Sequence, residues 1–199
     1  MTPLDLAMLR ERRHRLLAQA RGRVLELGGS GGANLDHYPA GAVDEVVVVG
    51  AGTSSRSRVE RAAARSSLDV RVARSARSMG EFDTIVAVFA LSGRPDLEAE
   101  LRSLVPLVKP DGQLLFMDHS PRRPPGVTTE LSRPFWRFMT DGFVPGRDLP
   151  ETLRRSGLTV LTLERFGLRT LTLPLRTCVA GVARRQRPGG GRRPKLRPS

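Results

Sequence analysis

The chain has 199 residues, 39% of them hydrophobic, which is enough for one domain with a core of its own. Its single cysteine, Cys178, excludes an internal disulfide, and no apolar run approaches the roughly 18 residues that span a bilayer. The N-terminal residues carry charges throughout and lack the apolar centre of a signal peptide. The sequence therefore predicts a cytoplasmic protein without a membrane span.

The net charge of +13 is concentrated at the C-terminus. Residues 184–199 contain seven basic and no acidic residues, so more than half of the excess positive charge lies there. We expect residues 1–183 to form one domain, with a helix in 1–20, and residues 184–199 to form a disordered basic tail. This tail is the only feature that favours binding of nucleic acid, and the simpler interpretation is that it increases solubility. The oligomeric state stays open.

Apolar runs and helical patterns alternate along the chain. Leucines share one face of residues 4–20, which predicts a helix. Residues 23–27 are an apolar run that ends in the glycine-rich segment 28–32, a pattern typical of a strand, a turn and the start of a helix. The later predicted strands span 45–49, 69–73, 82–89, 113–117, 159–166 and 177–183. The later predicted helices span 53–66, 96–107, 128–139 and 148–156, and Thr53 is the predicted cap of the first of them. A turn is predicted at 109–112.

Strands that alternate with helices predict βαβ units with right-handed crossovers. We therefore expect a Rossmann-like α/β three-layer sandwich, with a mostly parallel seven-stranded sheet and an antiparallel terminal strand. Ligands of such sheets bind beyond the carboxyl ends of strands, where the strand order reverses. The segment 28–32 is the first candidate for that place, although a glycine-rich turn can also be purely structural.

Several segments resemble a known family. The sequence VLELGGSGGANLDHYP (24–39) is similar to the first motif of class I S-adenosylmethionine-dependent methyltransferases, normally E-x-G-x-G-x-G. FDTIVAVFAL (82–91) and LRSLVPLVKPDGQLLFMDHS (101–120) resemble later motifs of the same family in the same order. The resemblance covers about residues 15–185 and is closest to the methyltransferase type 11 group, near the small thiol and quinone-biosynthesis methyltransferases.

The resemblance implies a site for S-adenosylmethionine. Glu26 would orient the cofactor's amino group or the turn, and Asn34 would lie near the cofactor. His119, after Asp118 at the end of the fifth strand, is the candidate general base if the acceptor must lose a proton; a histidine bonded to the backbone is the alternative. The remaining implied cofactor-binding residues are Gly28, Gly29, Ser30, Gly32, Gly50, Phe89 and Leu91.

Three features depart from the family pattern. Ser30 replaces the middle glycine, and a register that uses Gly29 and Gly31 would restore the spacing only with a longer first strand. Gly50 stands where relatives carry the acidic residue that binds the ribose hydroxyls, and the loop at 74–82 is short and basic. These departures leave two interpretations open: backbone contact with the ligand, or loss of cofactor binding.

The resemblance thus implies a methyltransferase that acts on a small, apolar acceptor, and the alternative is a catalytically degenerate protein that serves as a binding or regulatory module. An NAD-type oxidoreductase is less favoured, because the acidic residue after the second strand and the G-x-G-x-x-G spacing are missing. No cluster of cysteine and histidine suggests a metal site. Aromatic residues could cover the acceptor or simply the core: Phe135, Trp136 and Phe138.

Overall fold

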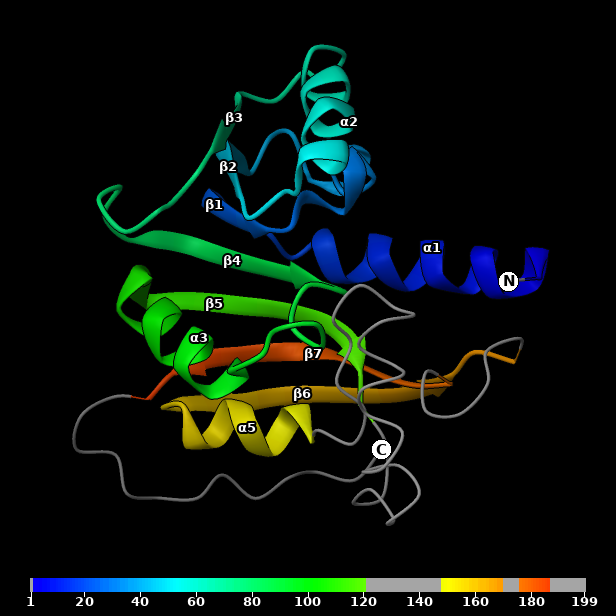
Figure 1. Ribbon diagram of the computed structural model, residues 1–199, viewed down its shortest axis with the longest axis vertical. Coiled ribbons are helices and arrows are strands. Elements are labelled where there is room, and N and C mark those ends of the chain that lie inside the picture. Colours follow the sequence, from blue (N-terminus) through cyan, green and yellow to red (C-terminus); the bar gives the residue numbers. More distant parts are fainter. Residues whose placement is uncertain (1, 121–147, 170–175, 187–199) are drawn as a thin grey trace.

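The computed structural model describes residues 2–120, 148–169 and 176–186. They form one sheet of seven strands in the order β3-β2-β1-β4-β5-β7-β6 (Figure 1). The strands are β1 Gly22–Leu27, β2 Val43–Val49, β3 Val70–Ala73, β4 Phe82–Val88, β5 Val108–His119, β6 Leu158–Gly167 and β7 Thr177–Arg185. The helices are α1 Pro3–Leu17, α2 Thr53–Ala63, α3 Leu97–Leu104 and α5 Leu149–Arg155, with short 3-10 helices η1 Gly29–Gly32, η2 Leu35–His37 and η3 Val105–Leu107.

The direction of the strands confirms the predicted fold class. β1 pairs in parallel with both β2 and β4, and β4 pairs in parallel with β5. β7 runs antiparallel between β5 and β6, so the predicted antiparallel strand lies inside the sheet and β6 forms the edge. The chain moves outward from β1 to β3 and then returns to β4. The strand order therefore reverses between β1 and β4, which is where sheets of this kind bind ligands.

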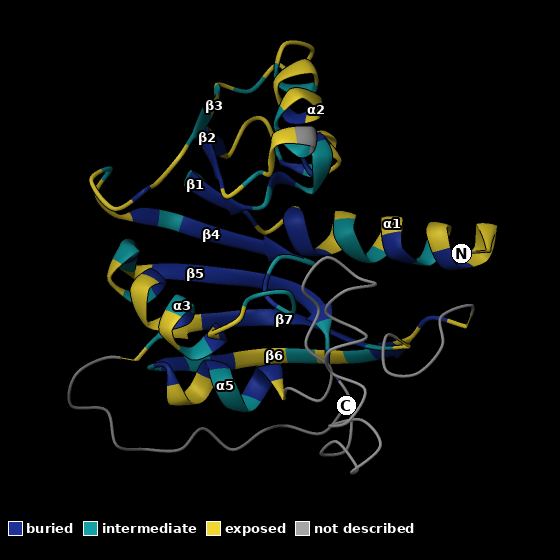
Figure 2. Cartoon of the chain, in the orientation of Figure 1, coloured by how far each residue is buried: buried dark blue, intermediate teal, exposed yellow. Residues whose placement is uncertain are grey.

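Two apolar cores hold helices to the two faces of the sheet. Leucines of α1 and Val59 of α2 pack on one face, against valines such as Val46 and Val48. Leucines of α3 and α5 pack on the other face, against residues such as Ile85 and Phe116. Figure 2 shows the central strands almost wholly buried between these layers. None of the helices in the described ranges is long and apolar enough to cross a membrane.

The predicted helix after the glycine-rich turn is wrong. The chain forms only η1 and η2 there, because Ser30 and Gly31 have left-handed backbone angles that an α-helix cannot contain. The predicted cap is also shifted, since Gly52 occupies the N-cap position of α2 and Thr53 is the first helical residue.

Two further boundaries differ from the sequence prediction. The expected turn at 109–112 is an irregularity within β5: Phe82 pairs with Val108, whereas Thr84 already pairs with Gln113. β7 continues through Arg185, which pairs with Leu158, so the predicted domain end at 183 falls inside a strand. The predicted helix at 128–139, its three aromatic residues and residues 187–199 of the tail lie outside the described residues.

Candidate active site

The glycine-rich turn leaves β1 at the point where the strand order reverses. Five consecutive residues have positive φ: Gly28 (75°), Gly29 (69°), Ser30 (41°), Gly31 (63°) and Gly32 (88°). Ser30 is held in this conformation by its hydroxyl, which donates to the Val88 carbonyl at 3.2 Å. β1 ends at Leu27, paired with Val49, so the alternative register with a longer first strand is wrong.

Two of the predicted glycines serve the packing of α2. A Cβ atom on Gly29 would lie 2.8 Å from methyl groups of both Val48 and Val59, and one on Gly32 would lie 2.4 Å from the Cβ atom of Ala62. These positions need glycine whether or not a ligand is bound. Gly28 differs, because a Cβ atom there would meet only Ala90, at an ordinary 3.5 Å.

Glu26 is fully buried beneath the turn and ties it to β1. Its carboxylate accepts hydrogen bonds from Asn34 Nδ2 at 2.9 Å and from the Tyr38 hydroxyl at 2.7 Å. Burial raises the pKa of Glu26 to about 6, although both hydrogen bonds and the charge of Arg13 act in the opposite direction. In the structure Glu26 holds the turn through these two contacts, which corresponds to the second of its two expected tasks.

Two buried polar atoms around Glu26 have no hydrogen-bond partner. Asn34 is fully buried, yet its Oδ1 is unpaired, and the Nε of Arg13 on α1 is buried and unpaired as well. Burial lowers the pKa of Arg13, and the charge of Glu26 partly offsets this effect. Unpaired buried polar atoms are rare in folded proteins because each costs about 1–3 kcal/mol. An acceptor and a donor are therefore available here for a polar ligand.

Gly50 directly follows β2, contributes no carboxylate and lies against an arginine. Its φ is 72°, and a Cβ atom there would lie 3.0 Å from Arg94 Nη2 and 3.9 Å from the Gly28 nitrogen. Arg94 follows β4 and donates through Nε to the Ala90 carbonyl at 3.2 Å. A guanidinium group consequently stands beside the position at which relatives carry a ribose-binding acid.

Asp118 anchors the loop that follows β4. It is fully buried, and its Oδ2 accepts from the backbone nitrogens of Leu91 at 2.7 Å and Ser92 at 3.1 Å. The same loop holds Phe89 at φ 51°. Leu91 and Asp118 are both fully buried, and Leu91 packs in the core on the α3 and α5 side of the sheet.

His119 ends β5 with its ring among apolar groups. The ring centroid lies 5.1 Å from that of Phe89, and Nδ1 lies 3.3 Å from the Cys178 sulfur. Burial, and next the charge of Asp118, raise the pKa of Cys178 to about 12. The thiol is therefore protonated near neutral pH and can donate a hydrogen bond to Nδ1.

Three residues of this site were not singled out from the sequence. Arg13 and Arg94 look like two of many surface arginines, because their partners are distant in the chain. Tyr38 donates its hydroxyl hydrogen to Glu26. A signal existed only for Tyr38, which closely follows the motif. In residues 2–120, 148–169 and 176–186, no group of three residues could hold a metal ion.

Comparison with known proteins identifies the family. A sequence model described as a methyltransferase domain matches residues 5–163. No curated protein sequence matches the chain significantly. Similar solved structures include a protein of Bacillus halodurans described as a methyltransferase, the N-methyltransferase NodS of Bradyrhizobium japonicum bound to S-adenosyl-L-homocysteine, and the [4+2]-cyclase SpnF.

These structures share the fold at low sequence identity. The Bacillus protein is 13% identical, with a TM-score of 0.69 over 89% of this chain and 99% of that one. NodS is 18% identical, with a TM-score of 0.68 over 91% and 87%. SpnF is 16% identical, with a TM-score of 0.68 over 90% and 80%. The sheet order, the turn after β1 and the sequence match agree, and the chain belongs to the methyltransferase domain family, with the class I fold.

Proposed function

We propose that this protein transfers a methyl group from S-adenosylmethionine to a small molecule. The observation that carries the proposal is the pair of unpartnered buried atoms, Asn34 Oδ1 and Arg13 Nε, around Glu26 below the left-handed turn. The methionine end of the cofactor carries an ammonium group and a carboxylate. An unpaired acceptor and an unpaired cationic donor match these two groups.

The residues at this end of the sheet fit the cofactor. Gly28 would let the cofactor approach the backbone, and Arg13 and Asn34 would hold the carboxylate and the amino group. Glu26 would keep the turn in place, as it does in the structure. NodS, a neighbour with the same fold, has S-adenosyl-L-homocysteine bound, which supports this choice of cofactor.

The bound cofactor would supply a methyl group already activated by its sulfonium, and the chain would align the acceptor and exclude water. Phe89 and His119 lie together at the carboxyl ends of β4 and β5, and they would face the acceptor. His119 would act as a base only for acceptors that must lose a proton, and it would otherwise position the acceptor.

Titration calorimetry of the full chain tests the binding step. Because Gly50 contributes no carboxylate to the ribose hydroxyls, we expect S-adenosylmethionine to bind with a dissociation constant weaker than about 10 μM. Arg13→Met should weaken binding about 10-fold or more, since it removes a charged hydrogen bond. Arg10→Met, an exposed position on the same helix, serves as the matched control.

Binding alone does not establish catalysis. A panel of small molecules incubated with the protein and methyl-labelled cofactor should yield labelled product and S-adenosylhomocysteine. No heat at millimolar cofactor would contradict the proposal, as would equal effects of the two arginine substitutions.

A catalytically degenerate binding module is the second candidate function. The contact of Arg94 with the Gly50 position favours it, because a cation there does not help a cationic cofactor. The cyclase SpnF has the same fold and is not named as a methyltransferase, which supports a wider range of functions for this architecture. Cofactor binding without methyl transfer to any member of the panel would favour this candidate.

A further inference from the structure

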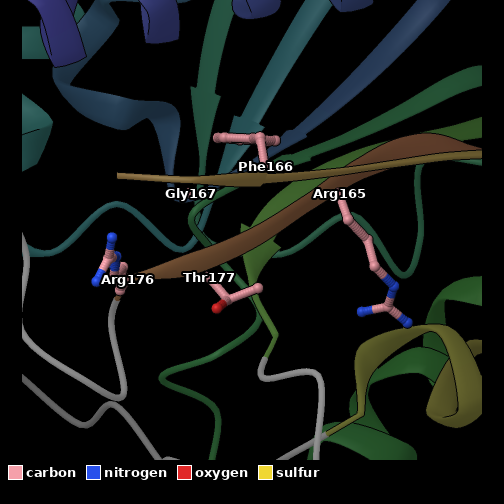
Figure 3. Close-up of a pocket in the computed structure, with 5 residues that line it drawn as sticks. All are labelled: Arg165, Phe166, Gly167, Arg176 and Thr177. Carbon is pink, nitrogen blue, oxygen red and sulfur yellow. The ribbon is translucent and has the colours of Figure 1, made fainter. Parts of the chain in front are cut away.

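A cavity of about 260 Å³ opens at the ends of β6 and β7, apart from the glycine-rich turn. The described residues that line it come from the end of β6 and the start of β7 (Figure 3): Arg165, Phe166, Gly167, Arg176 and Thr177. Two of these five residues are cationic and none is acidic. At this size the cavity admits a small molecule or one end of a longer one.

Arg165 is turned inward by the alternation of β6. It lies two residues after Leu163, which packs against the core on the α3 and α5 side, and it pairs across the ladder with the buried Val179. In Figure 3 the Arg165 side chain lies on the same side of the hairpin as Thr177, whereas Phe166 lies on the opposite side. The Nη1 atom of Arg165 is buried and has no hydrogen-bond partner.

The acidic residues closest in the chain and the sheet are engaged elsewhere. Glu164 forms an ion pair with Arg12 of α1 at 2.9 Å, on the face of the hairpin that Phe166 also occupies. Asp118, which pairs with Val179 in the ladder, accepts hydrogen bonds from backbone nitrogens. Among the described residues, neither Arg165 nor Arg176 forms an ion pair with a carboxylate, and only Arg165 has a buried nitrogen without a partner.

We propose that this cavity binds an oxyanion, a carboxylate or phosphate group carried by the methyl acceptor. A buried guanidinium donor without a partner is costly, and oxyanions satisfy such donors with short, charge-assisted bonds. The Thr177 hydroxyl adds a neutral donor at the rim. This inference rests on the proposed methyltransferase function, and it replaces the apolar acceptor expected from the sequence with an acceptor that has an anionic end.

The cavity lies near the carboxyl end of β5, where His119 is located. The backbone nitrogen of Ser120, directly after His119, donates to the Thr177 carbonyl at 3.0 Å. β5 and β6 are separated only by β7, so two strand spacings place Arg165 on the order of 10 Å from the end of β5. Arg165 shares one face of the sheet with Val179 and Asp118, whereas His119 shares the other face with Cys178. The acceptor would therefore be elongated and bend around the end of β5, with its oxyanion at Arg165 and its methylated atom near His119 and Phe89.

Anion binding can be measured without knowing the acceptor. We would titrate the full chain with inorganic phosphate and, separately, with acetate, in a buffer free of other oxyanions, and follow the heat and the backbone amide signals of Gly167 and Thr177 by NMR. Saturable binding is expected, and Arg165→Met should weaken it at least fivefold. Arg184→Met is the matched control, since it removes the same charge from an exposed position on β7. The tighter of the two ions identifies the acceptor group as phosphate or carboxylate.

The outcomes separate this inference from the proposed function. Equal weakening by Arg165→Met and Arg184→Met, or no saturation with either ion, would overturn the anion site even if S-adenosylmethionine binds. Anion binding lost only in Arg165→Met, with cofactor affinity unchanged in that variant, supports the site. The same result in a protein that binds no cofactor would keep the anion site and reject methyl transfer. Folding of Arg165→Met is verified by its amide spectrum, and Arg176→Met provides a second test at an independent position.

Discussion

Arg94 places a guanidinium group beside the Gly50 position, and Glu100 lies 3.9 Å from its Nε on the other side. S-adenosylmethionine carries a positive sulfonium that its demethylated product lacks. A nearby cation therefore disfavours the substrate form relative to the product. The chain is expected to bind S-adenosylhomocysteine more tightly than S-adenosylmethionine.

Arg94→Met should reduce this preference for the product by several-fold, since it removes the charge whether or not Arg94 also bonds to the ribose. Dissociation constants for both ligands, measured by calorimetry, give the ratio. Arg65→Met, an exposed position just beyond α2, is the control. An unchanged ratio in Arg94→Met would show that Arg94 does not face the cofactor.

Glu26 makes stability depend on pH in an unusual direction. Its pKa in the folded chain is about 6, above the ordinary 4.5, because it is buried. Folding thus favours the protonated form, and this contribution is fully present below pH 4.5 and is lost as the pH rises through 6. The shift of about 1.5 units corresponds to about 2 kcal/mol.

Glu26→Gln should abolish this dependence, since the amide does not titrate. Urea unfolding of both proteins between pH 4 and pH 7 measures it: the free energy of unfolding of the natural chain should fall by about 2 kcal/mol relative to the variant. Curves that stay parallel over this range would contradict the assignment of a raised pKa to Glu26.

At the scale of elements, the end of β7 lies beyond the predicted domain boundary at residue 183. Arg185 pairs with Leu158 in the sheet and forms an ion pair with Glu81, and the Gln186 nitrogen donates to the Gly157 carbonyl at 3.0 Å. The charge pattern placed the boundary at 183, because arginine runs resemble disordered tails. Backbone pairing does not require apolar side chains, so the strand continues through them.

A chain that ends at Ala183 should melt several degrees below one that ends at Gln186. The lost backbone hydrogen bonds amount to about 1–2 kcal/mol, and each kcal/mol shifts the melting temperature of a chain of this size by about 2–4 °C. Thermal unfolding of the two truncated chains gives the comparison. Equal melting temperatures would show that the last residues of β7 add nothing to the fold.

The strands were predictable from the sequence because each is a short apolar run bounded by turn residues. β2 and β4 each begin and end within two residues of their predicted limits. The elements around the glycine-rich turn were not predictable. The left-handed angles at Ser30 accompany a hydrogen bond to Val88 of β4, and Gly32 packs against Ala62 of α2. Both partners lie well beyond the turn in the chain, so the local sequence does not reveal that a helix is prevented there.

At the scale of the whole molecule, the sheet brings two groups of candidate functional residues to the end at which β1, β2, β4, β5 and β6 terminate. The carboxyl ends of β1, β2 and β4 carry the turn and Arg94, and the carboxyl ends of β5 and β6 carry His119 and Arg165. The antiparallel β7 makes this possible, because it returns the chain so that Thr177 lies beside Ser120. A single rigid sheet between two apolar cores thereby fixes the separation of the two clusters.

The sequence by itself determined the fold class, the order of its strands along the chain and the motif after β1, because apolar periodicity and turn residues are local properties. Only the tertiary structure decided which buried polar groups lack a partner. Asn34, Arg13 and Arg165 gain their significance from burial without a partner, and Glu26 gains its raised pKa in the same way. Burial and pairing are set by residues distant in the chain, so no local pattern reveals them.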